Sequence, residues 1–205
     1  REVAMQKRAE THFPIHDLLA ERWSPVTYSD RPVEPEQLGS LIEAARWAAS
    51  CYNEQPWRFI VATKDDPAAY ARMLGCLVEL NVAWAQHAPV LMIAVARERF
   101  ETNETPNGWA QHDVGMAVMN LLLQAAAMGL HAHGMAGFNK DTARETLGIP
   151  EGYEPMTAIA VGYLGDIENA PEKLKQRDQP PRQRRPLETI VFKGQWGVPA
   201  DFVKT

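Results

Sequence analysis

The chain has 205 residues, of which 45% are hydrophobic and 23% charged, and its formal net charge is −5. This size and composition are typical of a globular protein that can bury a core without disulfides. The negative balance argues against a nucleic-acid partner or a membrane-surface partner, because both favour a basic face. No apolar run reaches the roughly 18 residues of a membrane-spanning helix, so no membrane partner is expected.

The cysteine and histidine patterns exclude two kinds of site. Cys51 and Cys76 lie in no CxxC spacing, which is typical of a reduced, cytoplasmic protein. A buried, inert Cys51 is favoured over a catalytic thiol, because no histidine lies nearby in sequence to activate it. His131 and His133 would share one face of a strand, but no further ligands lie at useful spacing. No metal site is therefore predicted.

The hydrophobic pattern predicts helices that alternate with short strands. Residues 35–50 have a clear helical period, with a proline at a favourable first position. Residues 89–96 are apolar almost throughout, which is typical of a strand covered on both faces. Residues 109–128 form the longest predicted helix, apolar nearly all round and followed by a glycine. In chain order, we predict helix 14–23, helix 35–50, strand 58–63, a helix opening at 66, strand 89–96, helix 109–128, strand 130–137, helix 140–147, strand 157–163 and strand 187–192.

This order of elements predicts an α+β domain with helices layered on a sheet. Residues 1–13 are expected to be a flexible N-terminal arm, and residues 14–166 the main domain. Within the C-terminal arm, 167–205, the polar and proline-rich stretch 171–186 is expected to be exposed and extended. The strand predicted after it could reach a partner subunit and join a sheet there.

Four polar segments could carry chemistry: Arg22-x-Ser24, 50–57, 135–138 and 182–186. Each has an ordinary structural interpretation by itself, namely a surface cation, a capped turn, a turn glycine and a solvated basic run. Together they suggest a ligand with two different ends.

A planar, amide-rich ring and a phosphate would account for these four segments jointly. The side-chain amides of Asn53 and Gln55 can donate and accept along one edge of such a ring. Arginine forks and a hydroxyl suit a phosphate, and the residues that could supply them are Arg22, Ser24, Arg182 and Arg184. FMN has these two ends.

Five segments of the sequence resemble the FMN-dependent nitroreductase family. They are RWSPVTYSDRPV, EAARWAASCYNEQPWRFIVAT, HDVGMAVMNLLLQAAAMGLHAHGMAGF, GIPEGYEPMTAIAVGYLGD and RRPLETIVFKGQWG. The resemblance runs from about residue 14 to 197, and NxQPW is its most specific part. It implies an α+β fold with a mostly antiparallel central sheet among helices. It also implies an intertwined homodimer with an exchanged C-terminal strand and an FMN site per subunit at the dimer interface.

The resemblance also implies roles for particular residues. Arg22, Trp23 and Ser24 match the N-terminal cofactor motif, with phosphate and ribityl contacts. Asn53 and Gln55 match contacts to the flavin ring and ribityl chain. Ala136 and Gly137 match backbone donors near flavin N5, and Arg182 and Arg184 match a second phosphate-binding pair. Trp109 and His112 either cap and pack the long helix or line the substrate mouth.

Val26 departs from the family pattern, which has a basic residue at this position near flavin N1 and O2. A cation there would stabilise the negative charge that reduced flavin develops. We therefore expect a shifted redox potential, unless another cation such as Arg31 takes over.

The resemblance implies a ping-pong oxidoreductase in which FMN accepts a hydride from NADH or NADPH and then reduces a nitroaromatic, a quinone or a similar electron-poor acceptor. Two alternatives stay open. One is a reductase of an enoyl, carbonyl or halogenated metabolite, and the other is a flavin-binding protein of low turnover. The sequence does not choose between NADH and NADPH.

Overall fold

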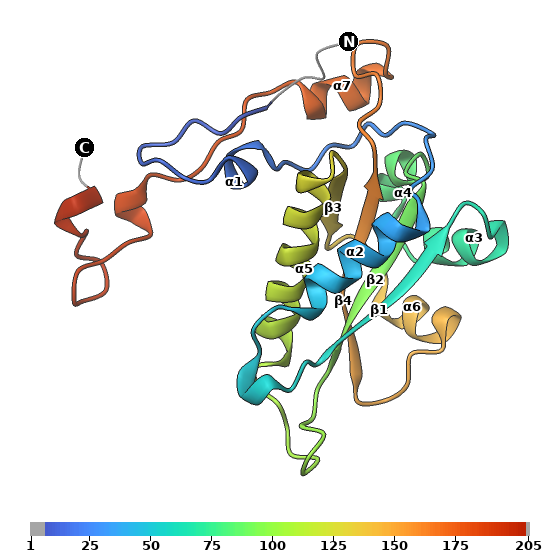
Figure 1. Ribbon diagram of the computed structural model, residues 1–205, viewed down its shortest axis with the longest axis horizontal. Helices are drawn as coiled ribbons and strands as arrows, with labels where there is room; N and C mark the ends of the chain where they lie inside the picture. The colour runs from blue at the N-terminus through green and yellow to red at the C-terminus, as the bar shows by residue number, and fades with distance from the viewer. Residues whose placement is uncertain (1–6, 204–205) are drawn as a thin grey trace.

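A four-stranded antiparallel sheet forms the centre of the computed structural model, which describes residues 7–203 (Figure 1). Every neighbouring pair of strands is antiparallel, in the order β1-β2-β4-β3. The strands are β1 (Trp57–Thr63), β2 (Val90–Arg97), β3 (His131–Met135) and β4 (Tyr153–Gly162). The predicted α+β class and antiparallel sheet are confirmed, and β3 lies at an edge of the sheet.

Helices cover both faces of the sheet (Figure 1). Alternate residues of β2 enter two separate apolar clusters, Val90 and Met92 on one face and Leu91 and Ile93 on the other. This double burial explains why the strand is apolar throughout. One face carries α2 (Pro35–Arg46) and α5 (Ala110–Ala127), and the other carries α3 (Pro67–Gly75), α4 (Glu79–Ala85) and α6 (Lys140–Leu147).

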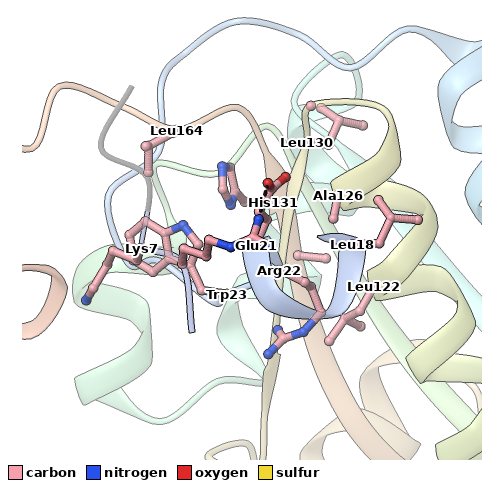
Figure 2. Close-up of a pocket in the computed structure, with 13 residues that line it drawn as sticks. Lys7, Leu18, Glu21, Arg22, Trp23, Leu122, Ala126, Leu130, His131 and Leu164 are labelled. Carbon is pink, nitrogen blue, oxygen red and sulfur yellow. Dashed lines mark hydrogen bonds and ion pairs between the residues drawn. The ribbon is translucent and has the colours of Figure 1, made fainter. Parts of the chain in front are cut away.

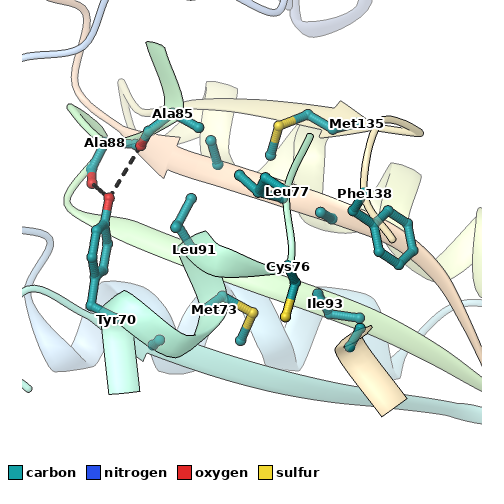
Figure 3. Packing of buried hydrophobic residues seen from close by; sticks show 14 of the residues in the cluster. Tyr70, Met73, Cys76, Leu77, Ala85, Ala88, Leu91, Ile93, Met135 and Phe138 are labelled. Atoms are coloured by element: carbon teal, nitrogen blue, oxygen red, sulfur yellow. Dashed lines mark hydrogen bonds between the residues drawn. The ribbon is translucent and has the colours of Figure 1, made fainter. Parts of the chain in front are cut away.

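The apolar cluster under α3 and α4 includes the hydroxyl group of Tyr70 (Figure 3). The Tyr70 hydroxyl donates to the carbonyl oxygens of Ala88, at 2.6 Å, and Ala85, at 3.1 Å. Burial raises the pKa of Tyr70 to about 12. The bonds fix the end of α4 against α3, because a buried hydroxyl needs a partner.

Local signals explain where several helices begin and end. Asp66 caps α3 by accepting from the Ala69 amide, and Pro67 occupies its first turn. Gly129 and Gly148 adopt φ angles of +71° and +67° after α5 and α6, a conformation that glycine tolerates best. The predicted helix 35–50 ends four residues early, at Arg46, and a 3-10 turn, η1 (Cys51–Asn53), follows.

The two ends of the described chain differ most from expectation. The first helix, α1 (Asp17–Glu21), is shorter than the predicted 14–23. A helix, α7 (Glu172–Asp178), occupies part of 171–186, so the prediction of a wholly extended stretch was wrong.

Residues 187–192 form a 3-10 turn, η2 (Leu187–Thr189), and one bridge from Phe192 to Pro199, so the predicted strand does not form within this chain. An alternating pattern needs a neighbouring strand to pair with, and none of the strands in the described part of the chain lies beside it. The last described element is η3 (Asp201–Val203).

The N-terminal segment and the segment after α7 run together, away from the sheet (Figure 1). Arg182 Nη1 donates to the carbonyl oxygen of Lys7 at 3.0 Å and to that of Ala20 at 2.6 Å. Of the predicted flexible arm, residues 1–6 lie outside the described residues. Between residues 7 and 203, no helix is long and apolar enough to cross a membrane.

Candidate functional site

Three arginines from two distant segments line one pocket. Arg22 directly follows α1, and Arg182 and Arg184 follow α7. Glu10 also lines this pocket, but none of the three arginines forms an ion pair with a carboxylate within residues 7–203. Burial, and then the charges of Arg182 and Arg184, lower the pKa of Arg22. Unneutralised and partly desolvated guanidinium groups of this kind are suited to an anion.

Ser24 and Trp23 lie beside these arginines but face different neighbours. Arg22 Nη1 donates to Ser24 Oγ at 3.3 Å, and that hydroxyl donates to the Ala132 carbonyl oxygen of β3 at 3.4 Å. Trp23 is buried in an adjacent pocket, edge-on to His131 with ring centroids 5.6 Å apart. Figure 2 shows Trp23 and His131 in that pocket, with the Arg22 guanidinium directed away from both.

Val26 points into the protein core, because its side chain is only 2% exposed and packs in the cluster that contains Tyr28 and Trp84. Its backbone N–H donates to both carboxylate oxygens of Asp178, at 3.0 and 3.1 Å, and the Thr27 N–H donates at 3.0 Å. Asp178 is 1% exposed. It fixes the loop after Arg22 from the far end of the chain. The sequence does not distinguish this residue, since nothing in a polar stretch marks one carboxylate as buried.

The segment that carries Asn53 and Gln55 is a strained turn. Tyr52, Asn53 and Gln55 have φ angles of +53°, +56° and +52°. Non-glycine residues in this region store strain that the surrounding structure must hold, and such residues cluster at functional sites. Here Asp113 Oδ2 accepts from the Cys51 N–H at 2.9 Å, while Ser50 Oγ accepts from the Gln55 N–H at 3.0 Å.

Trp109 and His112 lie beside this turn, at the beginning of α5. The two rings meet edge-on with centroids 5.9 Å apart, and His112 Nδ1 lies 3.2 Å from Asp113 Oδ1. Asp113 is 2% exposed, whereas Trp109 and His112 are exposed. The buried carboxylate of Asp113 thus contacts both the turn around Asn53 and the His112 ring, and that ring packs edge-on against Trp109.

Ala136 and Gly137 follow β3, where Gly137 meets the side chain of Asn81 from α4. The Gly137 carbonyl oxygen accepts from Asn81 Nδ2 at 2.9 Å and from the Val78 N–H at 3.1 Å. A Cβ atom at position 137 would lie 2.5 Å from Asn81 Nδ2, so the close approach requires glycine. Asn81 could not be predicted from the sequence, because one polar residue on a short helix carries no distinguishing signal.

His131 and His133 on β3 lie near the loop that follows Arg22. His133 Nδ1 lies 2.8 Å from the Pro25 carbonyl oxygen, and its ring lies 4.6 Å from that of Trp84. Burial is the main cause that lowers the pKa of both histidines. Within residues 7–203, no three histidine, cysteine or acidic side chains gather as a metal site would require.

The predicted residues therefore form separate groups within one chain. The arginine pocket borders Met119 of α5, whereas the strained turn contacts Asp113 in the first turn of that helix. With 1.5 Å of rise per residue, these positions are roughly 9 Å apart along the helix axis. Asn53 and Gln55 do not line the arginine pocket. Figure 1 shows η1 at the lower end of α5 and α1 beside its upper half.

Comparison with known proteins identifies the class to which this fold and these groups belong. The family model described as the nitroreductase family matches residues 19–163. The chain belongs to the nitroreductase family.

The chain is also similar to individual known proteins. A solved structure of an oxidoreductase containing FMN has a TM-score of 0.88 and 34% identity, covering 96% of this chain and 100% of that chain. The major NAD(P)H-flavin oxidoreductase of Aliivibrio fischeri is 27% identical, over 88% of this chain and 98% of its own length. An uncharacterised 15.4 kDa protein of Mycolicibacterium smegmatis is 38% identical, over 55% of this chain and 76% of its own length.

Proposed function

We propose that this protein is an NAD(P)H-dependent oxidoreductase that binds FMN. The observation that carries the proposal is the cluster of Arg22, Arg182 and Arg184, which has no carboxylate partner within residues 7–203. Each of these arginines opposes the charge of another, so a bound anion would relieve the repulsion, and a phosphate matches their donors. The arginines and the Ser24 hydroxyl thus fit the phosphate end of FMN.

The strained turn and the end of β3 fit the ring of the same cofactor. Asn53 and Gln55 carry side-chain amides that can pair with the polar edge of a flavin, and the turn around them is held in advance by Asp113. Ala136 and Gly137 follow β3, and their backbone N–H groups are the proposed donors near flavin N5. Asn81 keeps this segment in place by donating to the Gly137 carbonyl oxygen.

FMN, when bound, would accept a hydride from NADH or NADPH and pass reducing equivalents to an electron-poor acceptor such as a nitroaromatic or a quinone. The protein residues bind and orient the cofactor. Trp109 and His112 are exposed beside the strained turn and are the proposed contacts for the acceptor. The alternative is reduction of an enoyl, carbonyl or halogenated metabolite. Steady-state rates with a panel of acceptors from both classes distinguish the two functions.

We also propose that the complete site needs two copies of the chain. In one chain, Asn53 and Gln55 do not line the pocket of the arginines, so a second copy would supply the missing group. The segment after η2 supports this, because several of its large apolar side chains are exposed and a partner would bury them. They are Ile190, Trp196 and Phe202.

The first experiment is the absorption spectrum of the purified protein, followed by anaerobic addition of each nicotinamide. The expected result is a bound flavin spectrum that bleaches with NADH or NADPH. Replacing Arg22 by Ala is expected to lower FMN occupancy. Full occupancy and activity in this variant would contradict the phosphate assignment, and flavin that stays oxidised with both nicotinamides would favour a binding protein of low turnover.

A complementation experiment tests the shared site. Arg22→Ala and Asn53→Ala chains, each with a different tag, are co-expressed and the mixed dimer is isolated through both tags. One of its two sites would combine the intact arginines of one chain with the intact turn of the other, so about half of the wild-type FMN occupancy should return. Each variant alone should bind little FMN. If the mixed dimer binds no more FMN than the single variants, each site is built within one chain.

A further inference from the structure

His112 and Asp113 form a histidine–carboxylate pair in the first turn of α5. His112 Nδ1 lies 3.2 Å from Asp113 Oδ1. Asp113 is only 2% exposed, whereas the side chain of His112 is 61% exposed. The carboxylate of the pair is thus enclosed by the protein, and the imidazole ring is open to a molecule that arrives from solution.

Two neighbouring groups fix how this imidazole ring is oriented. Asp113 Oδ2 accepts from the Cys51 N–H at 2.9 Å, so the carboxylate is held with Oδ1 toward the His112 ring. Trp109 packs edge-on against the ring, with centroids 5.9 Å apart. A carboxylate beside Nδ1 keeps a proton on that nitrogen, so Nε2 becomes the atom at which the ring exchanges its proton.

Nε2 of His112 is free for an incoming molecule. Within residues 7–203, no protein group forms a hydrogen bond with this nitrogen. The histidines on β3 differ, because both are half-buried and His133 Nδ1 contacts the Pro25 carbonyl oxygen. Histidine exchanges its proton near neutral pH more readily than other side chains do. His112 therefore presents an exchangeable proton beside the strained turn, where the electron acceptor is proposed to bind.

The proposed acceptors need protons as well as electrons. A quinone that has taken up a hydride is a hydroquinone monoanion, and one more proton converts it into the neutral product. A side chain within hydrogen-bond reach of the acceptor oxygen can speed this step by general acid catalysis. Of the two residues proposed to contact the acceptor, Trp109 offers only an indole N–H that keeps its proton, so His112 is the one that can supply it.

We propose that His112 is the catalytic acid that protonates the reduced acceptor, and that Asp113 is its positioning residue. This assignment rests on the proposed function. The Nε2–H bond of the imidazolium breaks, and an O–H bond forms on the hydroquinone monoanion. His112 is left neutral with its remaining proton on Nδ1, facing Asp113, and water then returns a proton to Nε2.

The principal experiment compares two acceptors. The FMN-loaded protein is reduced anaerobically and mixed with p-benzoquinone, which needs a proton, or with ferricyanide, which takes up electrons alone. Stopped-flow absorbance then follows reoxidation of the flavin. His112→Gln is expected to lower the rate constant with benzoquinone about a hundredfold and to change the rate constant with ferricyanide far less. His87→Gln makes the same replacement at another exposed histidine and should leave both rate constants unchanged.

Imidazole in solution tests the acid role itself. Because the side chain at position 112 is exposed, free imidazole can reach the space that His112→Ala leaves. Imidazole should restore much of the benzoquinone rate in His112→Ala and should not affect that rate in the wild type. A purely structural role of His112 would not be replaced by a dissolved acid.

Nitrogen NMR of the cofactor-free protein tests the pair without the flavin. The neutral His112 ring should carry its proton on Nδ1, where it faces Asp113. A neutral ring protonated on Nε2, equal losses with the two acceptors in His112→Gln, or no rescue by imidazole would each overturn the assignment while the proposed function stands. A wild-type protein that binds no FMN would overturn the proposed function and the assignment with it.

Discussion

His131 and His133 are two titratable side chains held in surroundings that favour their neutral form. Both extend from the edge strand β3, and burial lowers the pKa of both below the ordinary value of 6.5. Protonation of either ring in the folded state would place a charge in a half-buried setting beside Arg22, which opposes it.

We therefore predict that the free energy of unfolding decreases as the pH falls below about 6.5. In this range the unfolded chain binds protons at these histidines and the folded chain does not, so acid favours unfolding. The loss continues down to the lowered pKa of the folded state, with at most about 1.4 kcal/mol per pH unit from each histidine. Urea unfolding between pH 5 and 8 measures this slope.

The matched comparison is His133→Gln against His87→Gln. His87 is exposed, and His133 is largely buried beside Pro25. The slope of stability with pH should be smaller in His133→Gln and unchanged in His87→Gln. An identical slope in wild type and His133→Gln would show that His133 does not contribute.

At the scale of the element, the end of β3 depends on a glycine. A Cβ atom on Gly137 would lie 2.5 Å from Asn81 Nδ2 and 3.0 Å from Val78 Cγ2, whereas one on Gly134 would lie 3.6 Å from Thr157 Oγ1, an ordinary contact. We predict that Gly137→Ala lowers the free energy of unfolding by about 1–3 kcal/mol, because the Asn81 side chain must shift, which breaks its bond to the Gly137 carbonyl oxygen, and Val78 must give way. Gly134→Ala should change it by less than about 1 kcal/mol. Urea unfolding of the two variants makes the comparison, and equal losses would contradict this account.

Elements with strong local signals were predicted well from the sequence. The helix at 140–147 and the capped beginning of α3 depend on residues within a few positions of each other. The helix α7 was missed because its stretch is polar and proline-rich, and its last residue is fixed by backbone groups about 150 positions earlier. The predicted strand at 187–192 does not form within the described residues of a single chain, because alternation describes one strand and not its neighbour. Its pairing with a partner stays a prediction.

The same distinction between local signals and long-range contacts explains which parts of the candidate site could be predicted from the sequence. The sequence suggested the arginines and amides as residue types, and the structure brings the three arginines to one pocket. Their role as cofactor contacts stays a prediction. Their surroundings could not be predicted: the buried carboxylates Asp113 and Asp178 and the inward orientation of Val26 all depend on long-range packing.

At the scale of the whole molecule, the arginine pocket connects the two ends of the described chain. Arg22, Arg182 and Arg184 repel each other, and a bound anion would turn this repulsion into attraction. We predict that inorganic phosphate raises the free energy of unfolding, by about 1.4 kcal/mol at ten times its dissociation constant. Chloride at the same ionic strength should have a smaller effect.

Arg184→Gln and Arg185→Gln are the matched variants for this prediction. Both residues are exposed and adjacent, but only Arg184 lines the pocket together with Arg22. The stabilisation by phosphate should shrink in Arg184→Gln and persist in Arg185→Gln. A thermal-shift series with increasing phosphate measures both, and equal shifts would contradict a specific anion site.

The like charges in this pocket also bear on the fate of the protein in a cell. A chain that has not acquired FMN would keep the repulsion between Arg22 and the segment after α7, and its unfolded fraction would be larger. Quality-control proteases remove proteins in proportion to that fraction. The amount of this protein should therefore follow the supply of riboflavin-derived cofactor, even when synthesis of the chain is constant.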